Sequence, residues 1–229
     1  MKQRVWLRRN GPSFTFCSKS DAKEWTIHEE KSFNSNNKEK EEDWKRYSPL
    51  FETDWDKRAT IDSMLRVDHA GEVGAREIYA GQLAVLRGKR ISEVIEEMAQ
   101  QEEKHFQCFE KLLVERRIRP TLFLPLCRVA GFSLGALTAL MGEKAAMACT
   151  VAVEEVISQH YNDQIRTIHE RKWKEEEHLK QTLREFRDDE MEHHDTGIEY
   201  EAESFPFYRN LTRIIQWGCQ TAIHITRRL

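Results

Sequence analysis

The sequence predicts an all-α protein, and three observations support that prediction. Two long stretches without proline, between Pro49 and Pro120 and between Pro125 and Pro206, are free to be helical. Within them apolar residues recur every three or four positions, which is the period of a helix with one buried face. The chain shows no marked alternation of apolar and polar residues of the kind that is typical of strands.

Composition sets the broad class. A chain of 229 residues can form one globular domain with a tail, and its net charge of −3 gives no general case for binding nucleic acid. The five cysteines are scattered and include no Cys-x-x-Cys pair. This pattern argues against a disulfide framework and favours a reducing compartment.

The N-terminal part differs from the rest. Residues 1–20 hold five Lys and Arg and no acid, which is typical of a mitochondrial transit peptide; a disordered basic tail is the alternative. Residues 21–59 are polar and low in complexity, and we expect a disordered linker there. Residues 60–229 are the predicted folded domain.

The first predicted helix runs from about residue 60 to 87. Gly74, Gly81 and Gly88 follow one another at seven-residue intervals. Because glycine is unfavourable inside a helix, this stripe predicts a close approach of a neighbouring helix.

A second helix is predicted over about 91–117, ending before Pro120. Residues 121–142 are the most apolar of the chain, but Pro125 and Arg128 interrupt them. A bilayer-spanning helix is therefore not expected. A membrane-associated helix in the interface, or one buried against the rest of the protein, fits better.

Three helices complete the chain. We expect one over about 143–171, a charged break at 172–177 and another helix over about 178–203. The last helix follows Pro206 and is amphipathic, with several arginines among its polar residues.

Two clusters of the form Glu-x-x-His lie in the middle of apolar faces. The first holds Glu102 and His105, and the second holds Glu190 and His193. A three-residue step places both side chains of a pair on one side of a helix. A buried charge without a partner is strongly unfavourable, and a bound metal ion would supply the partner. Oxygen and nitrogen ligands without thiolates suit iron or manganese.

The pattern Glu-x6-Tyr-x2-Gln occurs twice, 82 residues apart. Its members are Glu72, Tyr79 and Gln82 in the first half and Glu154, Tyr161 and Gln164 in the second. Each half thus supplies one such glutamate and one Glu-x-x-His. Four carboxylates and two imidazoles are the ligand set of ferritin-like four-helix bundles that hold two iron ions, and the four negative charges balance two divalent cations.

The predicted metal ligands are Glu72, Glu102, His105, Glu154, Glu190 and His193. Of the adjacent Glu154 and Glu155, only Glu154 lies on a continuous apolar face of its helix. Three further residues are candidates for supporting roles. Asp189 directly precedes Glu190, and because an acid at this place in di-iron bundles of this kind often orients the histidine of the opposite half, it is expected to orient His105. His69 lies one turn before the first glutamate and could support the ligands. Tyr161 is either core packing or a catalytic group in electron or proton transfer.

Four longer strings of sequence carry a family resemblance. They are RVDHAGE at 66–72, IYAGQ at 78–82, AVEE at 152–155 with HY at 160–161, and DEMEHHD at 189–195. With them the chain from about Thr60 to Leu229 resembles the 5-demethoxyubiquinone hydroxylases, the di-iron monooxygenases of ubiquinone biosynthesis. The ligands of that family fall on the six positions named above.

The resemblance implies hydroxylation of the ring of a polyprenyl demethoxy-benzoquinone, with dioxygen, two iron ions and NADH as the electron donor. It also implies a peripheral place on the matrix side of the inner mitochondrial membrane and a lipid-binding partner protein of the same pathway. The sequence contains no Gly-x-Gly-x-x-Gly after a strand, so it shows no dinucleotide-binding fold of its own.

Two other functions remain open from the residues alone. A ferroxidase or peroxide-scavenging di-iron protein would share the ligands, but it has no use for an apolar surface helix at 121–142. A metal-free helical scaffold at the membrane would leave six inward polar residues unexplained.

Overall fold

The structure is a computed structural model that describes residues 55–228. By its internal contacts the chain divides into two units, Met1–Lys57 and Arg58–Leu229, and the second unit carries the site. The predicted transit peptide (residues 1–20) and most of the predicted linker (residues 21–59) lie outside the described residues.

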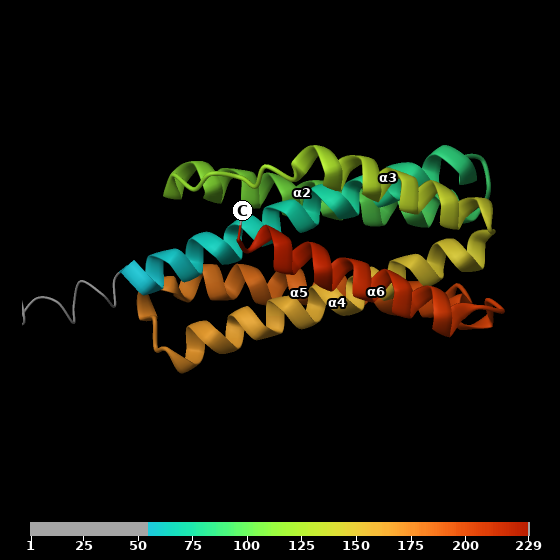
Figure 1. Cartoon of the computed structure of the whole chain (residues 1–229). Coiled ribbons are helices and arrows are strands. Elements are labelled where there is room, and N and C mark those ends of the chain that lie inside the picture. The colour runs from blue at the N-terminus through green and yellow to red at the C-terminus, as the bar shows by residue number, and fades with distance from the viewer. Residues whose placement is uncertain (1–54, 229) are drawn as a thin grey trace, which may run out of the picture. The chain divides into compact units, whose positions relative to one another are not determined.

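The described residues contain helices and no strand, which confirms the all-α prediction (Figure 1). In chain order the helices are residues 55–86, here called the first helix, α2 (Ile91–Arg116), α3 (Leu124–Leu140), α4 (Glu143–Glu170), η1 (Lys174–Glu176), α5 (Glu177–Glu199), η2 (Ala202–Ser204) and α6 (Tyr208–Thr226). The elements η1 and η2 are short 3-10 turns.

Two helix bounds differ clearly from the prediction. The first helix, expected from Thr60, is already helical at Trp55. The helix expected to reach Glu203 ends at Glu199, because Glu201 adopts a left-handed conformation (φ 61°) that cannot continue it. Gly88 (φ 82°) follows the end of the first helix in the same way, in a conformation that glycine adopts without strain.

The first helix and α3 touch through their backbones. A Cβ built on Gly81 would meet the carbonyl oxygen of Phe132, and one built on Gly135 would meet the carbonyl oxygen of Ile78. The predicted close approach is therefore present at Gly81. It is present at Gly74 as well, because a Cβ built on Gly131 of α3 would meet the carbonyl oxygen of Gly74, whereas Gly88 serves to end the helix instead.

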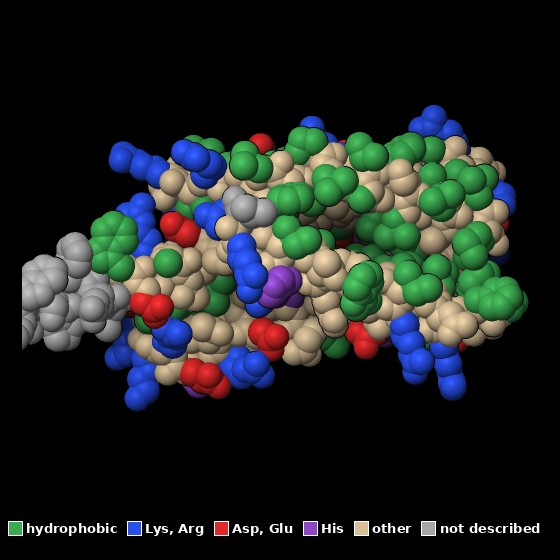
Figure 2. Space-filling model, in the orientation of Figure 1, with side chains coloured by type: hydrophobic (Ala, Val, Ile, Leu, Met, Phe, Trp, Pro, Cys, Tyr) green, Lys and Arg blue, Asp and Glu red, His purple; other side chains and the backbone are tan. Residues whose placement is uncertain are grey.

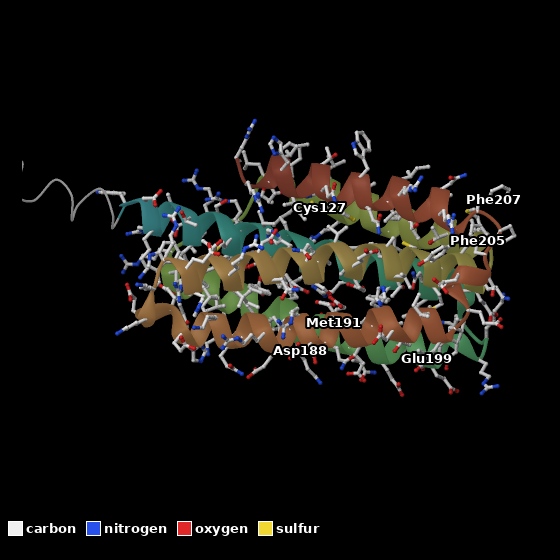
Figure 3. The ribbon with its side chains drawn as sticks, turned by 90° about the horizontal axis from the view of Figure 1, so that it is seen from below. Cys127, Asp188, Met191, Glu199, Phe205 and Phe207 are labelled. Carbon is white, nitrogen blue, oxygen red and sulfur yellow. The ribbon has the colours of Figure 1, made fainter. Side chains whose placement is uncertain are left out.

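The helices α2 and α5 each bury one narrow face. Along α2 the buried residues are Ile91, Ile95, Met98, Glu102, His105, Phe109 and Leu113. The apolar face predicted around Glu102 and His105 is therefore the buried face of α2. Figure 3 shows Asp188 and Glu199 on the outer side of α5, and both are exposed.

Apolar clusters lie on both sides of the Glu-x-x-His pair of α2. One cluster contains Met98, which precedes the pair, together with Met147 of α4. The other contains Phe109, which follows the pair, together with Leu183 of α5. The Glu-x-x-His pair of α2 thus lies between two groups of packed apolar side chains.

The helices α3 and α6 carry many of the exposed apolar side chains, and Figure 2 shows hydrophobic side chains gathered over both. On these helices they are Leu126, Val129, Phe132, Leu137, Leu140, Ile214, Trp217 and Ile225. None of the described helices combines the length and the hydropathy needed to cross a bilayer.

Candidate metal centre

Four helices bring the six predicted ligands together. The first helix supplies Glu72, α2 supplies Glu102 and His105, α4 supplies Glu154, and α5 supplies Glu190 and His193. None of these residues is more than 1% exposed. The neighbouring Glu155 is exposed and accepts a hydrogen bond from Gln216, so the helix register places Glu154 inward as predicted.

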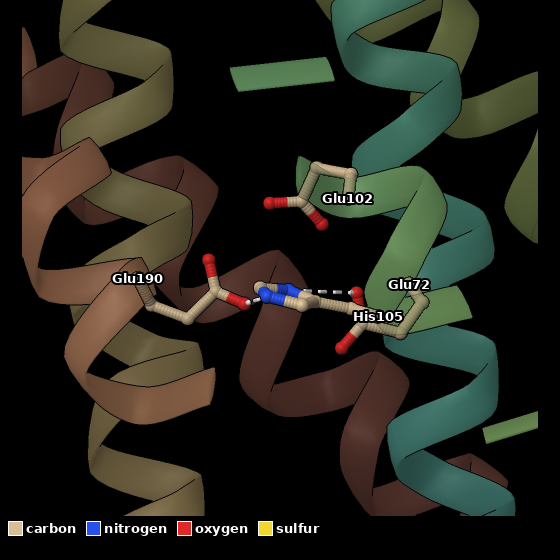
Figure 4. A group of neighbouring side chains, drawn as sticks. All are labelled: Glu72, Glu102, His105 and Glu190. Atoms are coloured by element: carbon tan, nitrogen blue, oxygen red, sulfur yellow. Dashed lines mark ion pairs between the residues drawn. The ribbon is translucent and has the colours of Figure 1, made fainter. Parts of the chain in front are cut away.

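The six side chains form two overlapping groups that could each hold a metal ion. The first group is Glu72, Glu102, His105 and Glu190, and the second is Glu102, Glu154, Glu190 and His193. Within each group the candidate ligand atoms lie within 4.8 Å of one another. Figure 4 shows Glu190 and Glu102 reaching the first group from different helices. Because Glu102 and Glu190 belong to both groups, they could bridge two ions.

Both imidazole rings face the cluster with the same nitrogen. His105 Nδ1 lies 3.2 Å from Glu190 Oε1, and His193 Nδ1 lies 3.1 Å from Glu102 Oε1. In each pair the ring nitrogen lies close to the carboxylate oxygen, as expected for donor atoms that share a cation.

The opposite nitrogen of each ring is held by a hydrogen bond from outside the cluster. His105 Nε2 lies 3.0 Å from Asp189 Oδ2, and His193 Nε2 lies 2.7 Å from Gln101 Oε1. Both partners are oxygen acceptors, so each ring donates from Nε2, and in the neutral ring this leaves the Nδ1 lone pair pointing inward. This is the tautomer that a metal ligand requires.

The cluster contains an unusual number of buried polar atoms without hydrogen-bond partners. They are Glu72 Oε2, both carboxylate oxygens of Glu102 and of Glu190, Glu154 Oε2, and the Nδ1 atoms of His105 and His193. Buried polar groups are almost always paired. Each of the six residues therefore has at least one buried atom free for a cation, and the donor set fits two divalent ions.

Burial perturbs the carboxyl groups strongly. Loss of solvent, together with the charge of Glu190, raises the pKa of Glu102 to about 7 and that of Glu154 to about 8. Loss of solvent and the charge of Glu102 raise the pKa of Glu72 well above its ordinary value. Burial alone would lower the pKa of His193, but the carboxylates of Glu102 and Glu190 close to its ring outweigh it and raise the pKa to about 11. Without a metal, protons would have to occupy the cluster.

Two buried tyrosines connect the halves of the repeat. Tyr79 of the first helix donates a hydrogen bond to Glu154 Oε1 at 2.8 Å, and Tyr161 of α4 donates one to Glu72. Each tyrosine thus holds the glutamate of the other half. This role of Tyr79 was not predicted from the sequence, although its place in the repeat was the available signal. A catalytic role for Tyr161 stays a prediction.

A second polar network lies one helical turn from Glu72. Gln164 Nε2 donates to Asp68 Oδ1 at 2.6 Å and lies 2.8 Å from His160 Nε2. Arg227 Nη2 donates to His160 Nδ1 at 3.3 Å. Burial raises the pKa of Asp68. This network joins residues far apart in the chain, and no local sequence pattern predicted it.

His69 does not share the contacts of the six predicted ligands. Its ring packs against Phe106, with 5.4 Å between ring centroids, and its buried Nδ1 has no hydrogen-bond partner among the described residues. Burial lowers the pKa of His69. No hydrogen bond or ion pair recorded for the described residues joins it to the six, so its supporting role stays a prediction.

The fold and the site define a class: helical proteins in which buried carboxylates and imidazoles form two adjoining metal-binding groups. Residues 59–226 match the family described as ubiquinone biosynthesis protein COQ7. The chain belongs to this family, and the resemblance seen in the sequence is confirmed.

Curated relatives carry consistent names. The chain is 53% identical over 171 residues to the mitochondrial NADPH-dependent 3-demethoxyubiquinone 3-hydroxylase of Rattus norvegicus. It is 50% identical over 173 residues to the 3-demethoxyubiquinol 3-hydroxylase of Rhodospirillum rubrum, and 41% identical over 184 residues to the mitochondrial 5-demethoxyubiquinone hydroxylase of Saccharomyces cerevisiae. Each alignment covers 75% of this chain and 79% of the relative.

Proposed function

We propose that the chain hydroxylates the ring of a demethoxyubiquinone in ubiquinone biosynthesis, as a monooxygenase with two iron ions. The observation that carries the di-iron part is the pair of histidines whose Nδ1 atoms, without hydrogen-bond partners, face buried carboxylates. Membership of the family supports the reaction and the substrate class.

The proposed fold is a ferritin-like bundle of the first helix, α2, α4 and α5 around the ions. Glu102 and Glu190 would bridge them, while Glu72 with His105 and Glu154 with His193 would bind one ion each. Bound iron would supply the activation of dioxygen. The protein's own part is to hold the six ligands in fixed rotamers, to place tyrosine hydroxyls against Glu72 and Glu154, and to exclude water.

The proposed electron donor is a reduced nicotinamide. The family resemblance implied NADH, whereas the printed name of the rat relative specifies NADPH. The two donors differ by one phosphate group, so a direct comparison of initial rates with each decides which of them serves this chain.

The proposed location is the inner mitochondrial membrane, on the matrix side, with peripheral attachment. The exposed apolar side chains of α3 and α6 support contact with lipid, because a soluble monomer rarely exposes so many together. The same surface would admit the isoprenoid tail of the substrate and a lipid-binding partner protein. Residues 1–20 would direct import.

The function is tested with purified full-length chain loaded with iron and reconstituted in liposomes that contain a demethoxyubiquinone. We expect a hydroxylated quinone, detected by mass spectrometry, that depends on reduced nicotinamide and dioxygen. Glu154→Ala should form none. Oxidation of added Fe(II) or removal of peroxide without any quinone product would instead support the ferroxidase or scavenger alternative.

A further inference from the structure

The two histidines of the cluster have chemically different partners at equivalent positions of the repeat. Asp189 directly precedes Glu190 and holds His105 of the other half, while Gln101 directly precedes Glu102 and holds His193. On both sides the partner oxygen faces Nε2 of the ring, at 3.0 Å for Asp189 and 2.7 Å for Gln101. One partner is a carboxylate, however, and the other is a neutral amide.

This difference changes what each ring offers to a cation. A hydrogen bond to a carboxylate is roughly twice as strong as one between neutral groups. It also draws the Nε2 proton away from the ring and makes the opposite Nδ1 a more basic donor. Asp189 adds a negative charge close to the group that contains His105 and Glu72. Gln101 orients His193 without adding charge.

A second position of the repeat differs in the same sense. Gln82 Nε2 donates to Thr150 Oγ1 at 3.3 Å, and Thr150 lies one turn before Glu154. Its counterpart Gln164 donates to Asp68, which lies one turn before Glu72. The half around Glu72 therefore again has an acid where the other half has a neutral group.

We propose that the two metal positions are unequal, and that a divalent cation binds first and more tightly at the position formed by Glu72 and His105. The inference rests on the proposed di-metal site and specifies its order of loading. Changing the partner of a ligating histidine alters metal affinity about 10- to 100-fold, which sets the expected size of the difference. Asp189 and Gln101 are positioning residues, because they act through the histidines.

The first experiment locates the first ion. Metal-free full-length protein is crystallised with one equivalent of Co²⁺, and anomalous scattering at the cobalt edge is measured. We expect the anomalous peak beside Glu72 and His105. Equal peaks at both positions, or a dominant peak beside Glu154 and His193, would overturn the inference and leave the di-metal site intact. Absence of bound Co²⁺ under any loading would overturn the proposed site and this inference together.

The second experiment exchanges the partners. Stepwise Co²⁺ affinities are measured by calorimetry for Asp189→Asn and Gln101→Glu, with Asp188→Asn and Gln100→Glu as neighbours that make the same charge changes on exposed positions. We expect Asp189→Asn to weaken the first step about 10- to 100-fold and Gln101→Glu to strengthen the second step. If each variant changes affinity no more than its exposed neighbour, the inference is overturned.

Discussion

The hydroxyl group of Tyr79 lies 2.8 Å from Glu154 Oε1, and both side chains are buried. The pKa of Tyr79 is raised well above its ordinary value by burial and by the charge of Glu154, so the hydroxyl stays a donor. We expect Tyr79→Phe to lower the free energy of unfolding of the metal-free protein at neutral pH by about 0.5–1.5 kcal/mol, the range for a hydrogen bond between neutral groups, because the pKa of Glu154 is raised to about 8. Chemical denaturation measures this change.

The control for that variant is Tyr208→Phe, in which a half-buried tyrosine loses a hydroxyl that makes no hydrogen bond recorded among the described residues. It should leave the free energy of unfolding nearly unchanged. Equal effects of the two substitutions would show that the bond to Glu154 contributes nothing specific.

The carboxyl groups of the cluster make the stability of the metal-free protein depend on pH. The pKa values of Glu102 (about 7) and Glu154 (about 8) lie above those of exposed glutamates, so the folded state binds protons more tightly than the unfolded state does. Their stabilising contribution is complete below about pH 4.5 and is lost as the pH rises towards 8. Denaturation of metal-free protein should therefore need less urea at pH 8 than at pH 6.

Metal should reverse that dependence, because binding requires ionised carboxylates and is favoured by rising pH. The increase in melting temperature on adding metal should thus be larger at pH 8 than at pH 6. Glu102→Gln should flatten the pH dependence of the metal-free protein, whereas Glu97→Gln on the exposed side of α2 should not. Identical melting with and without a chelator at both pH values would refute a buried metal centre.

The adjacent glutamates of α4 provide a matched pair for metal content. Glu154 is 1% exposed and belongs to the cluster, while Glu155 faces solvent. Glu154→Ala should lose most of the iron and the hydroxylation, and Glu155→Ala should keep both. Iron per chain, measured by elemental analysis of the folded variants, decides between them. An empty site in the Glu155 variant alone would contradict the assignment.

Two glycines of the first helix should respond in opposite directions to substitution. A Cβ at Gly81 would collide with the backbone of α3, so Gly81→Ala should destabilise the fold by about 1–3 kcal/mol. A Cβ at Gly74 has nothing within 4 Å, so Gly74→Ala should stabilise by roughly 0.5–1 kcal/mol through helix propensity. Thermal unfolding of both variants checks the prediction; a stabilised Gly81 variant would show that the two helices do not touch there.

Attachment to lipid should depend on the exposed apolar side chains of α3. Leu126 and Val129 are 59% and 66% exposed, and replacing both by glutamate should reduce flotation with liposomes. Val114 of α2 is 74% exposed but lies on another helix, so Val114→Glu is the control and should float as the unaltered protein does. Unchanged flotation of the α3 variant would exclude this helix as the attachment surface.

Local patterns in the sequence were enough to predict the helices and the ligand faces. The spacing of Glu102 and His105 within an apolar stripe fixes which side of α2 is buried, because a helix has a fixed period. The 82-residue repeat extends the same reasoning to Glu72 and Glu154. These predictions needed no knowledge of how the helices pack, since period and burial are properties of each segment alone.

Most contacts between distant segments could not be predicted from such patterns. The crossed pairing of Tyr79 with Glu154, the hydrogen bond from His193 to Gln101 and the approach of α3 to Gly81 depend on how helices are placed in three dimensions. The pairing of Asp189 with His105 was expected only from bundles of the same kind. A sequence period says which face a residue occupies, but the residue it meets there depends on packing between helices. For that reason the sequence was enough to predict the six candidate ligands, and the tertiary structure determined that the hydrogen-bond partners of the two histidines differ between the halves.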